Sequence, residues 1–150
     1  MFLPLGDEPN PRGTPWMTYG LIAANTLVYL LIALPMSGVR PDAADPLFRE
    51  YLQVLLETFP QGRSSEAEIV QQLTAYDLFV FDYGFRPAAP VPSALLTSMF
   101  LHAGFAHLAG NMLFLWIYGD NVEHRLGHGL FLVAYLITGV AATLFHSVFA

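Results

Sequence analysis

The stretch His102-Ala-Gly-Phe-Ala-His107-Leu-Ala-Gly-Asn111 places two histidines and an asparagine inside an apolar, uncharged run. Side chains that form hydrogen bonds are costly in a membrane interior, and those that occur there usually face the inside of a helix bundle. His107 and Asn111 are four residues apart, so on a helix they share one face. The stretch therefore predicts a membrane helix that carries a buried polar site.

The overall composition favours a membrane protein and excludes several other classes. Of the 150 residues, 55% are hydrophobic and only 12% are charged, whereas a soluble domain averages about 25% charged residues. Six arginines, no lysine and twelve acidic residues leave a net charge of -6, which argues against a nucleic-acid partner. The absence of cysteine excludes disulfides and thiolate metal sites.

Three uncharged stretches each reach the roughly 20 residues that a helix needs to cross a bilayer. They run over about residues 14–36, 93–118 and 130–150. Trp16 and Tyr19 stand at the start of the first stretch, where interfacial aromatic residues are common. We therefore expect an all-α, multi-pass membrane helix bundle, in which Asn25 of the first span forms a hydrogen bond to a neighbouring span.

The long connection over residues 37–92 carries too many charges to cross a membrane. Within it, Leu47, Tyr51, Leu55 and Phe59 recur at helical spacing, and residues 46–59 and 65–81 both form amphipathic patterns. We expect a partly helical domain at the membrane surface; the alternative is a lobe packed on the outside of the bundle. The short, polar connection over residues 119–129 predicts an antiparallel hairpin of the second and third spans.

His107 and Asn111 suggest a specific chemistry. An imidazole N–H and a side-chain amide directed into one cavity can both donate to a developing oxyanion. The alternative is that the two side chains only join helices by hydrogen bonds. His102 lies five residues before His107 and does not share its helical face, so we expect it to support the site from the water end of the span.

The short connection contains a second group of polar residues. His124 and His128 are four residues apart and, with Asp120 or Glu123, allow a metal site as an alternative. The favoured interpretation is structural: Glu123 and Arg125 tie the turn to the helix ends, and no metal is expected.

One segment resembles the second span and following turn of the rhomboid intramembrane serine proteases. It begins with Leu96-Thr-Ser-Met-Phe-Leu-His102 and continues to His128, and its matching residues are His107, Asn111, Gly119, Glu123, Arg125 and Gly127. Residues 14–25, Thr-Pro-Trp-Met-Thr-Tyr-Gly-Leu-Ile-Ala-Ala-Asn, are similar to the first span of bacterial members. The resemblance implies that this chain contains the first three transmembrane helices of a six-helix core with a long first loop. It also implies an endopeptidase that cleaves peptide bonds in or near transmembrane segments of other proteins.

The resemblance assigns roles to individual residues. His107 and Asn111 would stabilise the oxyanion beside the backbone amide of the nucleophile, and His102 would support the site. Glu123, Arg125 and Gly127 would form the structural turn. No cofactor is implied. The implied partners are transmembrane substrates, the lipid bilayer and the C-terminal spans of the same protein, and the implied location is a bacterial inner membrane with residues 1–13 in the cytoplasm.

The nucleophile motif of the family is not found in these 150 residues. The nearest match to Gly-x-Ser-Gly is Pro35-Met-Ser37-Gly38, which lacks the first glycine, and the general-base histidine of the sixth span has no counterpart. We therefore expect an N-terminal half that is inactive alone, because oxyanion donors without a nucleophile form no acyl-enzyme. The alternatives are a non-catalytic rhomboid-like protein that binds membrane clients, and an unrelated three-span protein.

Overall fold

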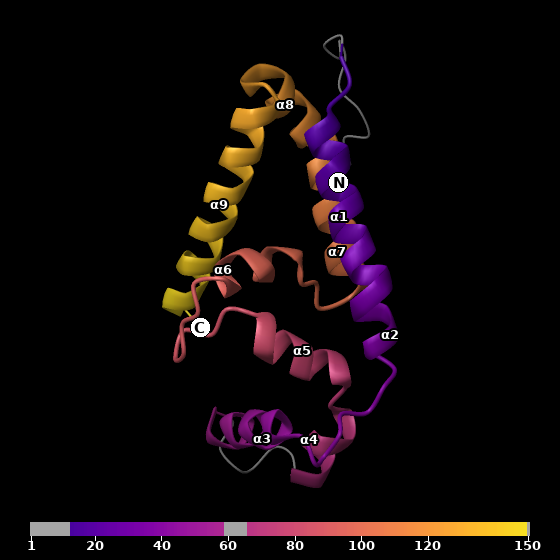
Figure 1. The fold of residues 1–150 in the computed structure, drawn as a ribbon, viewed down its shortest axis with the longest axis vertical. Coiled ribbons are helices and arrows are strands. Elements are labelled where there is room, and N and C mark those ends of the chain that lie inside the picture. The colour runs from indigo at the N-terminus through magenta and orange to yellow at the C-terminus, as the bar shows by residue number, and fades with distance from the viewer. Residues whose placement is uncertain (1–12, 59–65, 150) are drawn as a thin grey trace, which may run out of the picture.

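The computed structural model describes residues 13–58 and 66–149, and in these ranges the chain forms helices and no strand (Figure 1). The prediction of an all-α chain is confirmed. The expected cytoplasmic tail, apart from Gly13, and Phe59 lie outside the described residues.

Two long helices are apolar and long enough to cross a membrane. The first is a continuous rod made of α1 (Trp16–Val28), a π-helical turn η1 (Tyr29–Ala33) and α2 (Leu34–Met36). The other is α9 (His128–Phe149). Their lengths follow from uninterrupted apolar sequence without a charged residue between Thr14 and Met36 or between His128 and Val148.

The middle span is bent. The short helices α6 (Ala94–Thr97) and η2 (Ser98–Phe100) meet a longer rod formed by α7 (Phe105–Phe114), η3 (Leu115–Gly119) and α8 (Asp120–Leu126), at an angle of 95°. Counted as one span, this bent pair is the third candidate span. The expected span over about residues 93–118 is therefore present but broken, because Leu101 takes an extended conformation with φ -91° and ψ 122°.

The turn between α8 and α9 is shorter than the expected connection over residues 119–129. Helix α8 continues α7 and η3 without a break, and it ends at Gly127, which has φ +79°. Only glycine adopts this conformation without strain, so it ends the helix there. The amide of Gly127 donates to the carbonyl oxygen of Glu123 at 2.7 Å. The hairpin therefore turns at a single residue.

The long connection folds into a small helical lobe made of α3 (Pro46–Thr58), α4 (Glu66–Gln72) and α5 (Ala75–Tyr83). Phe48, Leu73 and Leu78 form its buried core. Partly buried apolar residues surround this core: Leu47, Tyr51, Leu52, Leu55, Ile69 and Val70. The apolar stripe of α3 is therefore used for packing within the lobe and is not free to lie on a membrane.

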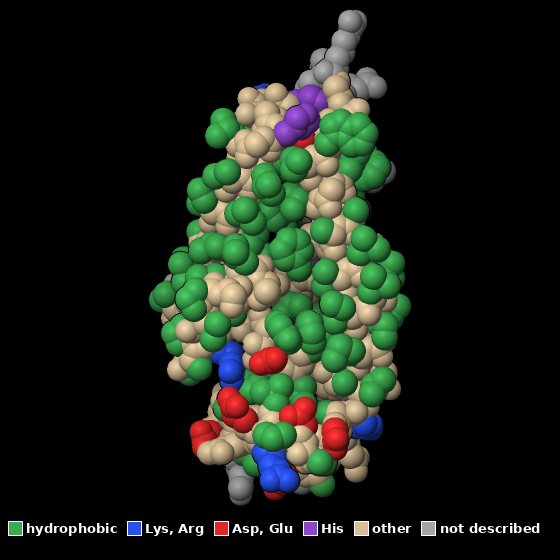
Figure 2. Space-filling view, viewed as in Figure 1, with side chains coloured by type: hydrophobic (Ala, Val, Ile, Leu, Met, Phe, Trp, Pro, Cys, Tyr) green, Lys and Arg blue, Asp and Glu red, His purple; other side chains and the backbone are tan. Residues whose placement is uncertain are grey.

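The lobe lies at one end of the molecule, below α6 in Figure 1. Acidic and basic side chains gather at this end of the surface, whereas apolar side chains dominate the face above it (Figure 2). Arg86 strengthens the lobe through an ion pair with Glu50 at 2.9 Å and by stacking over the ring of Phe81 at 4.0 Å. The connection is therefore partly helical, as expected, and its helices pack on one another, while its location at a membrane surface stays a prediction.

Candidate functional site

His107 and Asn111 lie on α7, one turn apart, as their spacing predicts. Both side chains are exposed. Among the residues that the structure describes, neither side chain has a hydrogen-bond partner. Their N–H groups are therefore available to an incoming acceptor, although whether they act on an oxyanion stays a prediction.

A cavity of about 430 Å³ lies beside this face of α7. Asn111 and His102 contribute polar atoms to its wall, and Asn25 reaches it from α1. The remaining wall is mostly apolar and comes from η2, α7, η3, α8 and α9, with Met99, Phe131 and Tyr135 among the contributors. A mostly apolar hollow with a few converging polar groups is the usual form of a binding site.

Asn25 does not bond to a neighbouring span, so that prediction is wrong. Its side-chain amide donates to the carbonyl oxygen of Leu21, one turn earlier in its own helix, at 2.8 Å. The side chain is fully buried, and its oxygen Oδ1 has no partner in the described structure. The intrahelical bond wins because the i−4 carbonyl is always within reach of a short polar side chain in a helix.

His102 lies in the break between η2 and α7 and is 3% exposed. Its ring is tilted by 60° against the ring of His107, with 5.1 Å between the ring centroids. Its backbone N–H donates to the hydroxyl of Tyr76 at 3.1 Å, and the same hydroxyl donates to the His102 carbonyl oxygen at 3.0 Å. The position of His102 beside His107 agrees with the supporting role predicted for it, but does not test that role.

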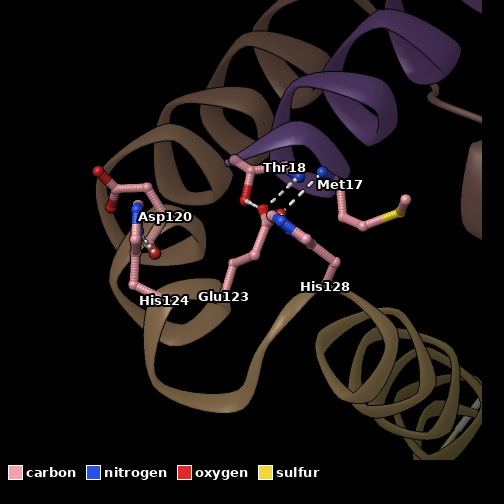
Figure 3. Close-up of polar contacts among 6 residues, drawn as sticks. All are labelled: Met17, Thr18, Asp120, Glu123, His124 and His128. Carbon is pink, nitrogen blue, oxygen red and sulfur yellow. Dashed lines mark hydrogen bonds and ion pairs between the residues drawn. The ribbon is translucent and has the colours of Figure 1, made fainter. Parts of the chain in front are cut away.

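Glu123 lies in α8, at the opposite end of the rod from His107 and Asn111, and is 1% exposed. Figure 3 shows its surroundings. Its carboxylate accepts hydrogen bonds from the amides of Met17 and Thr18, at 2.9 and 2.7 Å, and from the Thr18 hydroxyl at 2.7 Å. These amides belong to the first turn of α1, which has no side-chain cap of its own. An anion at a helix N-terminus satisfies unpaired N–H groups and complements the helix dipole. Glu123 therefore joins α8 to α1, and through His128 it also contacts the start of α9 across its own turn.

Close packing supports this contact. Thr18 is fully buried, and a Cβ on Gly119 would come within 3.2 Å of the Thr18 side chain and 3.0 Å of Leu115. Only a residue without a side chain fits there unless these neighbours move. The absence of a side chain at Gly119 lets the two helices approach closely enough for Glu123 to reach the start of α1.

The two histidines of the hairpin, His124 and His128, have different partners. His128 pairs with Glu123, whereas His124 contacts the carbonyl oxygen of Asp120 in its own helix at 2.7 Å (Figure 3). The described part of the chain contains no group of three or more metal-ligating side chains. Arg125 is exposed and makes no ion pair with a described residue, so only Glu123 and Gly127 of the predicted turn residues have an evident structural contact.

Sequence reasoning did not find two residues of these networks. Tyr76 lies 26 positions before His102 and Thr18 lies 105 positions before Glu123. No spacing rule connects residues so far apart. A buried tyrosine usually has a partner for its hydroxyl, which is a signal that Tyr76 has a partner but not which partner it has.

Comparison with known proteins gives a consistent result. Residues 91–150 match the model of the Rhomboid domain. The chain is 46% identical over 56 residues to "Rhomboid protease GluP" of Bacillus subtilis (strain 168), which covers 37% of this chain and 11% of that protein. It is 27% identical over 143 residues to "RHOMBOID-like protein 6, mitochondrial" of Arabidopsis thaliana, covering 91% of this chain and 44% of that protein.

A third relative, "Rhomboid-like protein 11, chloroplastic" of Arabidopsis thaliana, is 43% identical over 49 residues, or 33% of this chain and 18% of that protein. The chain spans less than half the length of each of these relatives. No solved structure gives a significant match. The matched region contains α6 to α9, and so His102, His107, Asn111 and the Glu123 turn, which agrees with the resemblance read from these residues. The chain is therefore similar to rhomboid proteins, and this similarity is carried by residues 91–150, which match the Rhomboid domain.

Proposed function

We propose that this chain supplies the oxyanion-binding part of an intramembrane serine endopeptidase. One observation carries the proposal: His107 and Asn111 lie one turn apart on α7, unpaired within the described residues, and Asn111 faces a largely apolar cavity. Hydrogen-bond donors held in place on a helix stabilise a developing negative charge better than water does, because they need no reorganisation.

In this mechanism, the substrate is a transmembrane segment whose scissile carbonyl oxygen becomes negatively charged when a serine attacks the carbonyl carbon. The imidazole N–H of His107 and the amide N–H₂ of Asn111 donate to that oxygen. The serine and the base that activates it would come from parts of the protein outside these 150 residues. Residues 1–150 alone are then expected to be inactive.

The test uses the protein expressed from its complete reading frame and reconstituted with a fluorogenic transmembrane substrate. Asn111→Ala should lower kcat by about 10²–10³, the usual effect of losing one oxyanion donor, with little change in KM. Asn121→Ala is the matched control. It lies on the same rod, and its amide donates to the carbonyl oxygen of Ile117 in its own helix at 3.1 Å, so kcat should stay within about threefold of wild type.

Two results would contradict the proposal. Equal effects of the two substitutions would show that Asn111 has no special role in the reaction. If no cleavage is found but membrane clients are bound equally well with and without His107 and Asn111, the chain instead belongs to a non-catalytic binding protein.

The proposed location is the inner membrane of a bacterium. The named relatives come from a bacterium and from plant organelles, and the helices of this chain can span any of these membranes. Fractionation of cells that express the tagged protein, followed by extraction at high pH, tests this. Protein retained in the inner-membrane fraction supports the proposal, and protein released into the supernatant contradicts it.

A further inference from the structure

The break between η2 and α7 leaves backbone polar groups without helical partners. At Leu101 the chain is extended, and α7 does not begin until Phe105. His102, between them, is buried. A buried N–H or carbonyl group without a partner costs free energy comparable to a lost hydrogen bond, so such a break persists only if another group satisfies it.

Tyr76 satisfies both backbone groups of His102 with one hydroxyl. The hydroxyl accepts from the His102 amide at 3.1 Å and donates to the His102 carbonyl oxygen at 3.0 Å. A phenol is suited to this because it offers one donor and also accepts. A phenylalanine ring in the same place would leave both backbone groups unpaired.

Tyr76 is itself held firmly. It is 6% exposed and lies in the first turn of α5, whose N-terminus is closed by a reciprocal capping box between Thr74 and Asp77. The amide of Ala75 donates to the carbonyl oxygen of Val39 at 2.8 Å, which links α5 to the end of the first span. Burial raises the pKa of Tyr76 above its ordinary value of 10.0, so the hydroxyl keeps its proton and its bond to the His102 carbonyl oxygen further into the alkaline range.

The effect of Tyr76 reaches the proposed site through His102. The His102 ring packs against the His107 ring, and its Nδ1 lies 3.3 Å from the carbonyl oxygen of Phe100 on the other side of the break. His102 also lines the cavity together with Asn111. A shift of the His102 backbone would therefore move a side chain that touches one proposed oxyanion donor and shares a cavity wall with the other.

We propose that Tyr76 is a positioning residue: its hydroxyl, supplied by the lobe, fixes the helix break at His102, and this sets the orientation of His107 for oxyanion binding. The inference rests on the proposed function for its catalytic consequence. It assigns the lobe a role in the chemistry that Tyr76 exerts through its hydrogen bonds to His102. The lobe then holds the chain in place just before the start of α7 through the two hydrogen bonds of Tyr76.

The test compares Tyr76→Phe with Tyr51→Phe in the protein expressed from its complete reading frame and placed in lipid nanodiscs. Tyr51 belongs to the same lobe, and its hydroxyl has no hydrogen bond among the described residues, so the control removes the same atom without affecting His102. Tyr76→Phe should speed amide hydrogen exchange in the peptide containing His102 by about tenfold, the equivalent of one net hydrogen bond. It should also shift the imidazole ¹⁵N resonances of His107. Tyr51→Phe should do neither.

Kinetics separates positioning from a merely structural role. Tyr76→Phe should lower kcat by about tenfold and leave KM within about twofold, because the substrate still binds while an oxyanion donor is misplaced. Faster exchange at His102 with an unchanged kcat would overturn the proposal, as would equal effects of the two substitutions.

The failure of the proposed function would look different. If the wild-type protein cleaves no substrate, the proposed function fails, and the exchange and resonance measurements decide the positioning role alone. An unchanged His107 resonance in Tyr76→Phe would then refute it, and a shifted resonance would support it.

Discussion

Polar side chains have opposite environments at the two ends of the rod that runs from Phe105 to Leu126. At one end, His107 and Asn111 are exposed and have no hydrogen-bond partner in the described structure. At the other end, Glu123 is buried and accepts three hydrogen bonds from Met17 and Thr18. A polar group that stabilises a fold has its partners inside the fold, whereas one that binds a ligand is left without them.

The rod therefore carries two kinds of polar residue: one kind that stabilises the fold and another kind whose donors are available to a ligand. Substitution at the Glu123 end should affect folding, and substitution at the His107 end should affect chemistry. The following predictions test that separation, starting with the largest expected effect on stability.

Removing the Glu123 carboxylate should cause the largest loss. Glu123→Ala would leave two amides in the first turn of α1 and the Thr18 hydroxyl without an acceptor. Breaking one partner of such a buried charged network costs about 3–5 kcal/mol, and this should appear as a lower free energy of unfolding in mixed micelles. Glu123→Gln keeps one acceptor oxygen and should lose less. A change below about 1 kcal/mol in Glu123→Ala would show that the cap does not hold α1 to α8.

Alanine substitution of two glycines on the rod should have opposite effects. At Gly119 the new methyl group would meet Leu115 at 3.0 Å and Thr18 at 3.2 Å, whereas at Gly110 nothing lies within 4 Å. We expect Gly119→Ala to lower the free energy of unfolding by about 1–2 kcal/mol through overpacking. Gly110→Ala should raise it by about 0.5 kcal/mol, because alanine has the better helix propensity. Equal effects at the two positions would contradict the close approach of Thr18 to α8 and η3 at Gly119.

The smallest expected effect is a loss of stability at alkaline pH. Burial raises the pKa of Tyr76 above its ordinary value of 10.0. The folded state therefore holds this proton more tightly than the unfolded state, and the resulting stability is complete below about pH 10 and is lost as the pH rises through the folded pKa. Unfolding measured from pH 9 upwards should show a steeper decline in the wild type than in Tyr76→Phe.

An identical decline in Tyr76→Phe would exclude Tyr76 as the source. Burial also raises the pKa of Tyr51. Some decline should therefore remain in Tyr76→Phe, and Tyr51→Phe is the matched comparison.

The sequence predicted the local features of this molecule well. Long apolar runs predict the helices beginning at Trp16 and His128, and the four-residue spacing of His107 and Asn111 predicts their shared face. The apolar stripe through Leu47, Tyr51 and Leu55 predicts helix α3. Each of these inferences depends on residues within a few turns of one another, where helical periodicity is informative.

The features that depend on distant residues could not be predicted. The break at His102 is stabilised by Tyr76 of the lobe, and no proline or charged residue marks it in the sequence. Glu123 was expected to tie the turn to helix ends, and it contacts the starts of α1 and α9. That the distant Thr18 of α1 would be a partner could not be predicted, because the close approach of the two helices at Gly119 is a tertiary feature. The stripe on α3 predicts an amphipathic helix, but not that this helix packs against α4 and α5. In each case a tertiary contact decides between local possibilities that the sequence leaves equal.

The most direct test measures activity and stability together for His107→Ala in the protein expressed from its complete reading frame. The account predicts that kcat falls by about 10²–10³ while the free energy of unfolding stays within about 0.5 kcal/mol of wild type, as for a surface substitution away from packed features. A kcat within about threefold of wild type, or a loss of stability as large as that of Glu123→Ala, would contradict the claim that the His107 end of the rod is built for oxyanion binding.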